Sequence, residues 1–322
     1  INGTLPQPKP LDVILVIDSS NSMKDVVGGK TLFTYAKEAA KSLTQKLLPT
    51  GNSTNRVAIV TFGYTNYGFN YGPGTLNTDS WLDRDFTYNQ GQVISTINNL
   101  SYAGGTNTQA GFRRAKNTMV ANARAGADKI IVFLSDGVPS VSLGNAYGPN
   151  EPTEHNIHTT AAYQEAQSMF PLGYKIFTVG LFGGITDNDV KRIAQETMQW
   201  SQNAGYKECQ AAADLTDIYN QIYEQMNYYA ANTLITDQIE DEFELVENSI
   251  VTRINGQVVT SPSVNYNPST RTITWEPGNL DSPVTLTYHI KALDSFGGGE
   301  NIPTNVQATI NYTNVTGTPN QT

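Results

Sequence analysis

A carboxylate and two hydroxyls stand at alternate positions in the segment Asp18-Ser19-Ser20-Asn21-Ser22. Asp18 closes a run of apolar residues, so this segment is expected in the loop that follows a buried strand. Carboxylate and hydroxyl oxygens are hard ligands of the kind that Mg²⁺ prefers. Taken alone, however, a segment of this type more often caps a helix than binds a metal.

Two other segments offer oxygens of the same kind. Thr106 follows two glycines, which let the backbone come close to an ion. Asp136 ends another apolar run, and the carboxyl ends of strands in a doubly wound sheet meet at one edge. Two carboxylates and three neutral hydroxyls suit Mg²⁺, or Mn²⁺ in its place, and leave the ion able to accept a further carboxylate. The expected metal ligands are Asp18, Ser20, Ser22, Thr106 and Asp136.

The elements that must position these side chains follow from the apolar pattern. Apolar strands alternate with amphipathic helices through residues 10–231, which predicts an α/β domain with a doubly wound, mostly parallel sheet. Strands are expected at 12–18, 56–63, 129–135 and 175–181, and helices at 31–48, 93–100, 109–123, 186–197 and 215–230. Residues 232–322 instead show short alternating segments between turn-rich stretches, which predicts an all-β immunoglobulin-like sandwich.

Composition excludes several classes of protein. The net charge of -9 disfavours nucleic acid and anionic membrane surfaces as partners. No stretch approaches the roughly 20 apolar residues that span a bilayer, so membrane insertion is not expected. Cys209 is the only cysteine, which excludes an intrachain disulfide and, with the Asn- and Thr-rich composition, favours a bacterial extracellular protein. No phosphate loop, nucleophile elbow or dinucleotide motif occurs, so an enzyme is not expected.

Together these features resemble the von Willebrand factor A family and its metal-ion-dependent adhesion site, Asp-x-Ser-x-Ser with a distant Thr and Asp. The resemblance covers residues 10–231, and every position of the motif is present. It implies that the Ser and Thr hydroxyls bind the ion and that the Asp carboxylates act directly or through water. It also implies that the vacant coordination position takes a carboxylate from a partner.

The second part of the chain resembles the collagen-adhesin-type sandwiches of Gram-positive surface proteins. The segments that carry the likeness are LITD at 234–237, TITW at 272–275 and IPTN at 302–305. In pilus tip adhesins such a sandwich is built from segments on both sides of an A domain. Residues 1–9 would then be the remnant of its first strand, and the chain reads as a mature fragment.

Those sandwiches often contain a Lys–Asn isopeptide bond that an acidic residue assists. The resemblance implies that Asp237 is the acid and Asn305 the acceptor. The lysine should lie on the first strand, which begins before Ile1. Lys9 stands between two prolines and is therefore poorly placed in a strand.

Two long insertions, at 64–89 and 141–158, interrupt the α/β pattern. The first is rich in aromatic residues, which are typical anchors of binding surfaces. We expect it to form a recognition rim beside the metal site, with flexible connectors as the alternative. The rim candidates are Tyr64, Trp81 and Phe86.

The function expected from these features is metal-dependent adhesion at the bacterial cell surface, by a virulence factor at a pilus tip. The partners would be a host extracellular-matrix or cell-surface protein, bound through a carboxylate, and the backbone pilin subunits. Regions outside this chain would supply the cell-wall anchor. The main alternative is a structural pilus or cell-wall assembly module whose metal site is vestigial. An enzyme that uses the ion as a Lewis acid is the weakest reading, because no general base is evident beside the site.

Overall fold

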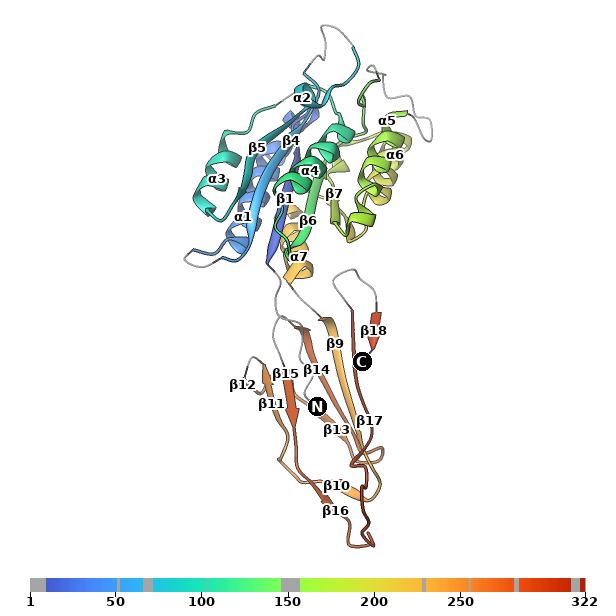
Figure 1. Ribbon diagram of the computed structural model, residues 1–322. Helices are drawn as coiled ribbons and strands as arrows, with labels where there is room; N and C mark the ends of the chain where they lie inside the picture. Colours follow the sequence, from blue (N-terminus) through green and yellow to red (C-terminus); the bar gives the residue numbers. More distant parts are fainter. Residues whose placement is uncertain are drawn as a thin grey trace. The chain divides into compact units, whose positions relative to one another are not determined.

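The computed structural model describes residues 10–50, 53–65, 72–102, 104–145, 157–227, 230–254, 256–280, 284–313 and 319–321. The chain packs as two compact units (Figure 1). The first, called the α/β unit, extends to Tyr223, and the second, called the β unit, begins at Glu224. This division falls earlier than the boundary expected at residue 231. The strand expected at residues 1–9 lies outside the described residues.

A six-stranded sheet forms the centre of the α/β unit, in the order β5-β4-β1-β6-β7-β8. All neighbours are parallel except β5, which runs antiparallel to β4 at the edge. The doubly wound, mostly parallel sheet is therefore confirmed. The strands are β1 (Leu11–Asp18), β4 (Arg56–Phe62), β5 (Ser80–Thr87), β6 (Asp128–Ser135), β7 (Lys175–Gly180) and β8 (Gly205–Glu208).

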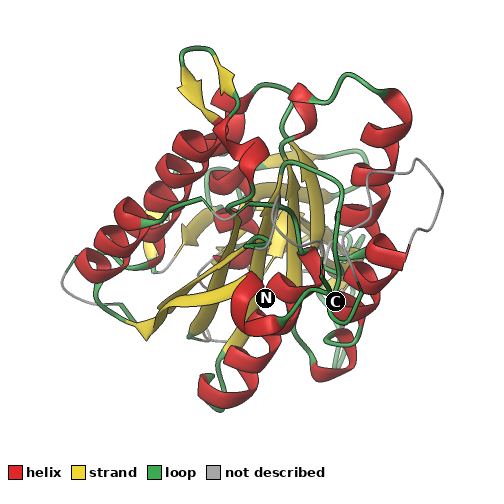
Figure 2. Ribbon diagram, turned by 90° about the horizontal axis from the view of Figure 1, so that it is seen from above, coloured by secondary structure: helices red, strands yellow, loops and turns green. Residues whose placement is uncertain are grey.

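Helices flank this sheet on both sides (Figure 2). On one face, α4, α5 and α6 pack apolar side chains such as Phe112, Ala166 and Ile193 onto alternate strand residues, including Val16 and Phe133. The opposite face carries α1, α3 and α7 (Figure 1). Burial on both faces explains why β1 is apolar along its length. The helices are α1 (Leu32–Leu47), α2 (Leu76–Asp79), α3 (Gln90–Asn99), α4 (Thr108–Asn122), α5 (Ile157–Gln167), α6 (Asn188–Trp200) and α7 (Leu215–Asn227).

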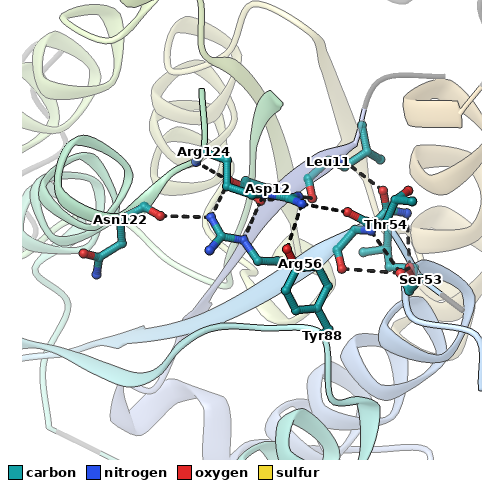
Figure 3. Close-up of polar contacts among 10 residues, drawn as sticks. Leu11, Asp12, Ser53, Thr54, Arg56, Tyr88, Asn122 and Arg124 are labelled. Atoms are coloured by element: carbon teal, nitrogen blue, oxygen red, sulfur yellow. Dashed lines mark hydrogen bonds and ion pairs between the residues drawn. The ribbon is translucent and has the colours of Figure 1, made fainter. Parts of the chain in front are cut away.

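A buried ion-pair cluster fixes the amino end of β1 (Figure 3). Asp12 is fully buried and accepts hydrogen bonds from the guanidinium groups of Arg56 and Arg124, at 2.7–3.0 Å, and from the backbone N–H of Arg124. Burial alone would raise the pKa of Asp12, but these hydrogen bonds outweigh it and lower that pKa. The cluster lies at the opposite end of β1 from Asp18.

Antiparallel strands make up the β unit, which confirms the all-β sandwich. Its largest sheet has the order β13-β14-β9-β17-β18, and smaller sheets pair β12-β11-β15 and β10-β16. Trp275, Ile273 and Ile239 are fully buried at its core. The strands are β9 (Ala230–Ile239), β10 (Phe243–Leu245), β11 (Val251–Ile254), β12 (Gln257–Val259), β13 (Asn265–Asn267), β14 (Thr272–Leu280), β15 (Val284–Thr287), β16 (Ile290–Ala292), β17 (Asn305–Thr313) and β18 (Pro319–Gln321).

Two sequence-based expectations were wrong in detail. The helix expected to reach Ala230 ends at Asn227, and Ala230 already begins β9, where pairing with β14 and β17 holds the chain extended. The first insertion is also not a plain loop, because α2 and β5 lie within it. Among the described helices, none is long and apolar enough to cross a membrane.

Candidate metal site

Asp18 ends β1 and is fully buried at the carboxyl edge of the sheet. Its Oδ1 accepts the backbone N–H of Ser20 at 2.8 Å, and its Oδ2 accepts the Ser135 hydroxyl at 2.7 Å. The first bond folds the loop back onto the carboxylate, and the second ties the ends of β1 and β6 together. Both oxygens therefore hold neighbouring groups of the site in place.

The two serines of the motif meet the second carboxylate across the sheet edge. The Ser20 and Ser22 hydroxyl oxygens lie 3.0 Å apart, and Ser22 Oγ donates to Asp136 Oδ1 at 2.9 Å. The other carboxylate oxygen, Asp136 Oδ2, is buried, and no described residue donates a hydrogen bond to it. A buried carboxylate oxygen without a donor is costly, and a cation would satisfy it.

Thr106 lies in a third loop. Hydrogen bonds of its backbone join this loop to the segments on two sides of it. The N–H of Asn21 donates to the carbonyl of Gly104, which joins this loop to the serine motif. Ser140 Oγ accepts the N–H of Thr106 at 3.1 Å, and the N–H of Ser140 donates to the Thr106 carbonyl at 3.0 Å. Thr106 is thus fixed between the serine loop and the segment that follows Asp136.

These loops enclose a cavity of about 260 Å³. Its lining combines the polar residues Ser20, Ser22, Thr106 and Asp136 with the apolar residues Val138, Ile185 and Val190. Asp18 does not line the cavity and lies behind the serine loop. A larger groove, of about 560 Å³, lies in the β unit and contains none of the expected ligands.

The electrostatics of the site also favour a cation. Burial raises the pKa of Asp18, although hydrogen bonds from Ser135 and Ser20 offset part of that rise. Burial raises the pKa of Asp136 well above its ordinary value, and the negative charge of Asp18 raises it further. Two buried carboxylates that repel each other are stabilised by a divalent cation placed between their loops. The donor set of carboxylate and hydroxyl oxygens fits Mg²⁺ or Mn²⁺.

The structure corrects two of the three rim candidates. Tyr64 is fully buried and donates its hydroxyl to the Gly72 carbonyl at 2.7 Å, so it cannot be an exposed anchor. Phe86 packs against the core near the far end of β5, with the Arg56 guanidinium 4.9 Å from its ring centroid. Because β5 is antiparallel, this end lies away from the metal edge. Trp81 pairs with Thr61 near the carboxyl end of β4 and is half-buried, so it stays a prediction.

Sequence reasoning missed the two serines that support the ligands. Ser135 precedes Asp136 and supports Asp18, and a polar residue at the end of an apolar run was a usable signal. Ser140 supports Thr106 from a segment without any motif, so no signal in the residue pattern pointed to it. Such outer partners orient ligands in metal sites.

In the β unit, Asp237 and Asn305 lie side by side. Asp237 is 2% exposed, and its two carboxylate oxygens accept the amide of Asn305 and, at 2.7 Å, the hydroxyl of Tyr288. The Asn305 amide also donates to the Tyr288 hydroxyl at 2.7 Å, and its oxygen accepts from Thr304 at 2.8 Å. Burial and the bond to Asp237 raise the pKa of Tyr288. Lys9 lies outside the described residues.

Comparison with known families divides the chain at nearly the same place as the packing. The von Willebrand factor type A domain family matches residues 12–221. A second family, described as the Ig-like domain of GBS104-like tip pilins, matches residues 229–322.

Relatives and solved structures cover almost the whole chain. The minor fimbrium subunit Mfa5 of Porphyromonas gingivalis is 24% identical over 97% of this chain and 32% of its own length. The pilus adhesin SpaC from Lactobacillus rhamnosus GG has a TM-score of 0.65 at 19% identity, covering 96% of this chain and 43% of that one. The pilus adhesin RrgA from Streptococcus pneumoniae has a TM-score of 0.52 at 18% identity, covering 96% and 60%. The structural likenesses show a shared fold, and the chain spans about a third of Mfa5.

Proposed function

Because this chain belongs to the von Willebrand factor type A domain family, we propose that it is a metal-dependent adhesin that binds an acidic group of a host protein. Relatives named as a pilus adhesin and a minor fimbrium subunit support a place at the tip of a surface pilus, with backbone pilin subunits as assembly partners. A role in virulence and a cell-wall anchor outside this chain are parts of the same proposal.

One observation carries this proposal. Asp136 Oδ2 is buried without a hydrogen-bond donor among the described residues, and it belongs to the carboxylate that also lines the cavity. A purely structural loop would have satisfied this oxygen with a donor. The geometry therefore favours a working cation site over a vestigial one.

The chain's own residues divide the work of this site. Ser20, Ser22, Thr106 and Asp136 face the cavity and would hold the ion, while Asp18 orients the serine loop from behind. When bound, the ion offers an open position to a partner carboxylate. Three of the four cavity-lining ligands are neutral, so the site leaves much of the ion's charge for that carboxylate.

Selectivity among acidic partners must come from the surface around the cavity, because every protein surface offers carboxylates. Ile185 and Val190 are apolar residues of the cavity lining and are only partly buried. Trp81 lies at the same edge of the sheet. We propose that such side chains contact the residues next to the partner's carboxylate.

Capture of host matrix proteins on the immobilised chain tests the adhesion mechanism. We expect binding in Mg²⁺ and loss of binding in chelator. Thr106→Ala should weaken binding to every acidic partner, because it changes the ion site itself. Trp81→Ala should keep metal affinity and change which partners bind. Loss of an aromatic anchor of this kind typically costs about 2 kcal/mol or more of binding free energy. Binding to the preferred partner that persists in chelator would contradict the mechanism.

For the β unit we propose an isopeptide bond between Asn305 and a lysine upstream of the described residues, with Asp237 as the assisting acid. The lysine Nζ would attack the Asn305 side-chain carbonyl carbon, and the amide nitrogen would leave as ammonia. A form of the protein extended upstream to include that lysine should then weigh one ammonia less than its sequence mass. Asn305→Asp and Asp237→Ala provide the controls, since neither should form the bond by this route. An unshifted intact mass in the extended protein would contradict the assignment.

A further inference from the structure

A buried carboxylate of the α/β unit lies outside the ligand set. Asp79 ends α2 and has no exposed surface. Its Oδ2 accepts the N–H of Thr75 at 2.8 Å and the side-chain amide of Asn107 at 2.9 Å, and its Oδ1 accepts the Thr78 hydroxyl at 2.9 Å. A buried carboxylate requires such donors. The bond to Asn107 is the one that leaves the first insertion.

Asn107 follows Thr106 and has two tasks. Its amide nitrogen donates to Asp79, and its amide oxygen accepts the N–H of Ala110 at 3.0 Å, which makes it the N-cap of α4. The position of the cap therefore depends on Asp79. Because Thr106 is joined directly to this cap, the direction of the Thr106 hydroxyl depends on it too.

Gly74 shows how tightly the surrounding segments are packed on this pair. A Cβ at this position would lie 2.5 Å from the Asn107 amide nitrogen, 2.7 Å from the Ser142 carbonyl oxygen and 2.9 Å from Asp79 Oδ2. The N–H of Gly74 donates to the Asn145 carbonyl, and its carbonyl accepts from Gly144. The described parts of the two insertions therefore meet at the Asp79–Asn107 pair.

We propose that Asp79 is a positioning residue for the metal site, which through Asn107 holds the Thr106 hydroxyl toward the ion. The first insertion then helps to orient a metal ligand, in addition to any contact that it makes with a partner. This inference rests on the proposed function, because it requires Thr106 to be a metal ligand. Asp79 itself does not line the cavity.

Titration of the full chain with Mn²⁺ by calorimetry tests the proposal through three variants. Asp79→Leu keeps the approximate size but removes the acceptor for Asn107, so Mn²⁺ affinity should fall about 10- to 100-fold, as for other outer-shell partners. Asp79→Asn should stay close to wild type, because its amide oxygen can accept from both Thr75 and Asn107 while its amide nitrogen donates to Thr78. Asn107→Ser keeps an N-cap residue but cannot reach Asp79, so it should lose affinity as Asp79→Leu does.

The double variant Asp79→Leu/Asn107→Ser should lose no more affinity than either single variant, since both remove the same bond. Glu165→Leu is the matched control, because Glu165 is also a buried carboxylate, paired with Arg113 between α4 and α5. It should lower the unfolding temperature without changing Mn²⁺ affinity.

The outcomes separate the proposals. Unchanged affinity in Asp79→Leu, beside a wild type that binds Mn²⁺, would overturn the positioning role alone. Equal losses in Asp79→Asn and Asp79→Leu would also overturn it, since the negative charge and not the hydrogen bond would then matter. A wild type that binds no Mn²⁺ would overturn the metal site itself.

Discussion

Replacing Asp18 by alanine is expected to abolish Mg²⁺ binding. The substitution removes one of the two buried negative charges of the site and frees the Ser20 N–H and the Ser135 hydroxyl that its carboxylate holds. Loss of an outer partner alone typically costs 10- to 100-fold in metal affinity, so removal of a charge as well should exceed about 100-fold. Calorimetric titration with Mg²⁺ or Mn²⁺ measures the change.

Asp217→Ala is the control for this experiment. Asp217 is an exposed carboxylate in the first turn of α7, and its removal should leave the titration unchanged. The unfolding temperature of each metal-free variant shows whether the α/β unit is still folded. Metal affinity that stays at the wild-type value in Asp18→Ala would place the ion at another site.

Asp136→Asn is expected to abolish metal binding and yet stabilise the metal-free α/β unit at neutral pH. In the folded chain, burial and the charge of Asp18 hold the pKa of Asp136 well above its ordinary value. A carboxyl group whose pKa is higher in the folded chain than in the unfolded chain stabilises the fold fully when the pH is below the unfolded-state pKa. This stabilisation is lost as the pH rises through the folded-state pKa. The contribution of Asp136 to the stability of the metal-free wild type should therefore be lost between mildly acidic and neutral pH.

An amide at position 136 does not titrate, so the part of the pH dependence that Asp136 contributes should disappear in the variant, while the part due to buried Asp18 remains. At neutral pH the gain should be on the order of 1–3 kcal/mol, because the neutral amide avoids a buried charge beside Asp18 and one unit of pKa shift corresponds to about 1.4 kcal/mol. Mg²⁺ should raise the unfolding temperature of wild type at neutral pH and have no effect on the variant. Scanning calorimetry is suitable, because the two units need not unfold together.

Two results would contradict this account. A stability advantage of metal-free Asp136→Asn over wild type that does not grow between mildly acidic and neutral pH would show that the Asp136 pKa is not raised. An Asp136→Asn variant that Mg²⁺ stabilises as strongly as wild type would show that this carboxylate is not a ligand.

The amino-acid sequence by itself determined the fold class and supplied the candidate ligands of the proposed metal site. Apolar runs that end in Asp18 and Asp136 indicate buried parallel strands, and parallel strands bring their carboxyl ends to one edge. The types of these candidate ligands are local properties, so the pattern of residues was enough to propose them. The change from helical to alternating periodicity likewise revealed the β unit.

Only the tertiary structure decided what surrounds the site. An aromatic residue in a predicted loop can be exposed or buried, and Tyr64 is buried beside Gly105, with its hydroxyl satisfied by the Gly72 carbonyl. Phe86 lies away from the metal edge because β5 runs antiparallel to β4. The direction of a strand at a sheet edge cannot be predicted from local periodicity.

The supporting groups also come from pairings that are distant in sequence. Ser140 holds Thr106, Asp79 holds Asn107, and Tyr288 joins Asp237 to Asn305, although no motif points to Ser140, Asp79 or Tyr288. Periodicity reports which face of an element is buried, whereas these contacts depend on which loops the sheet order brings together. The sequence was therefore enough to propose the ligands of the site, and the fold determined the groups that contact those residues.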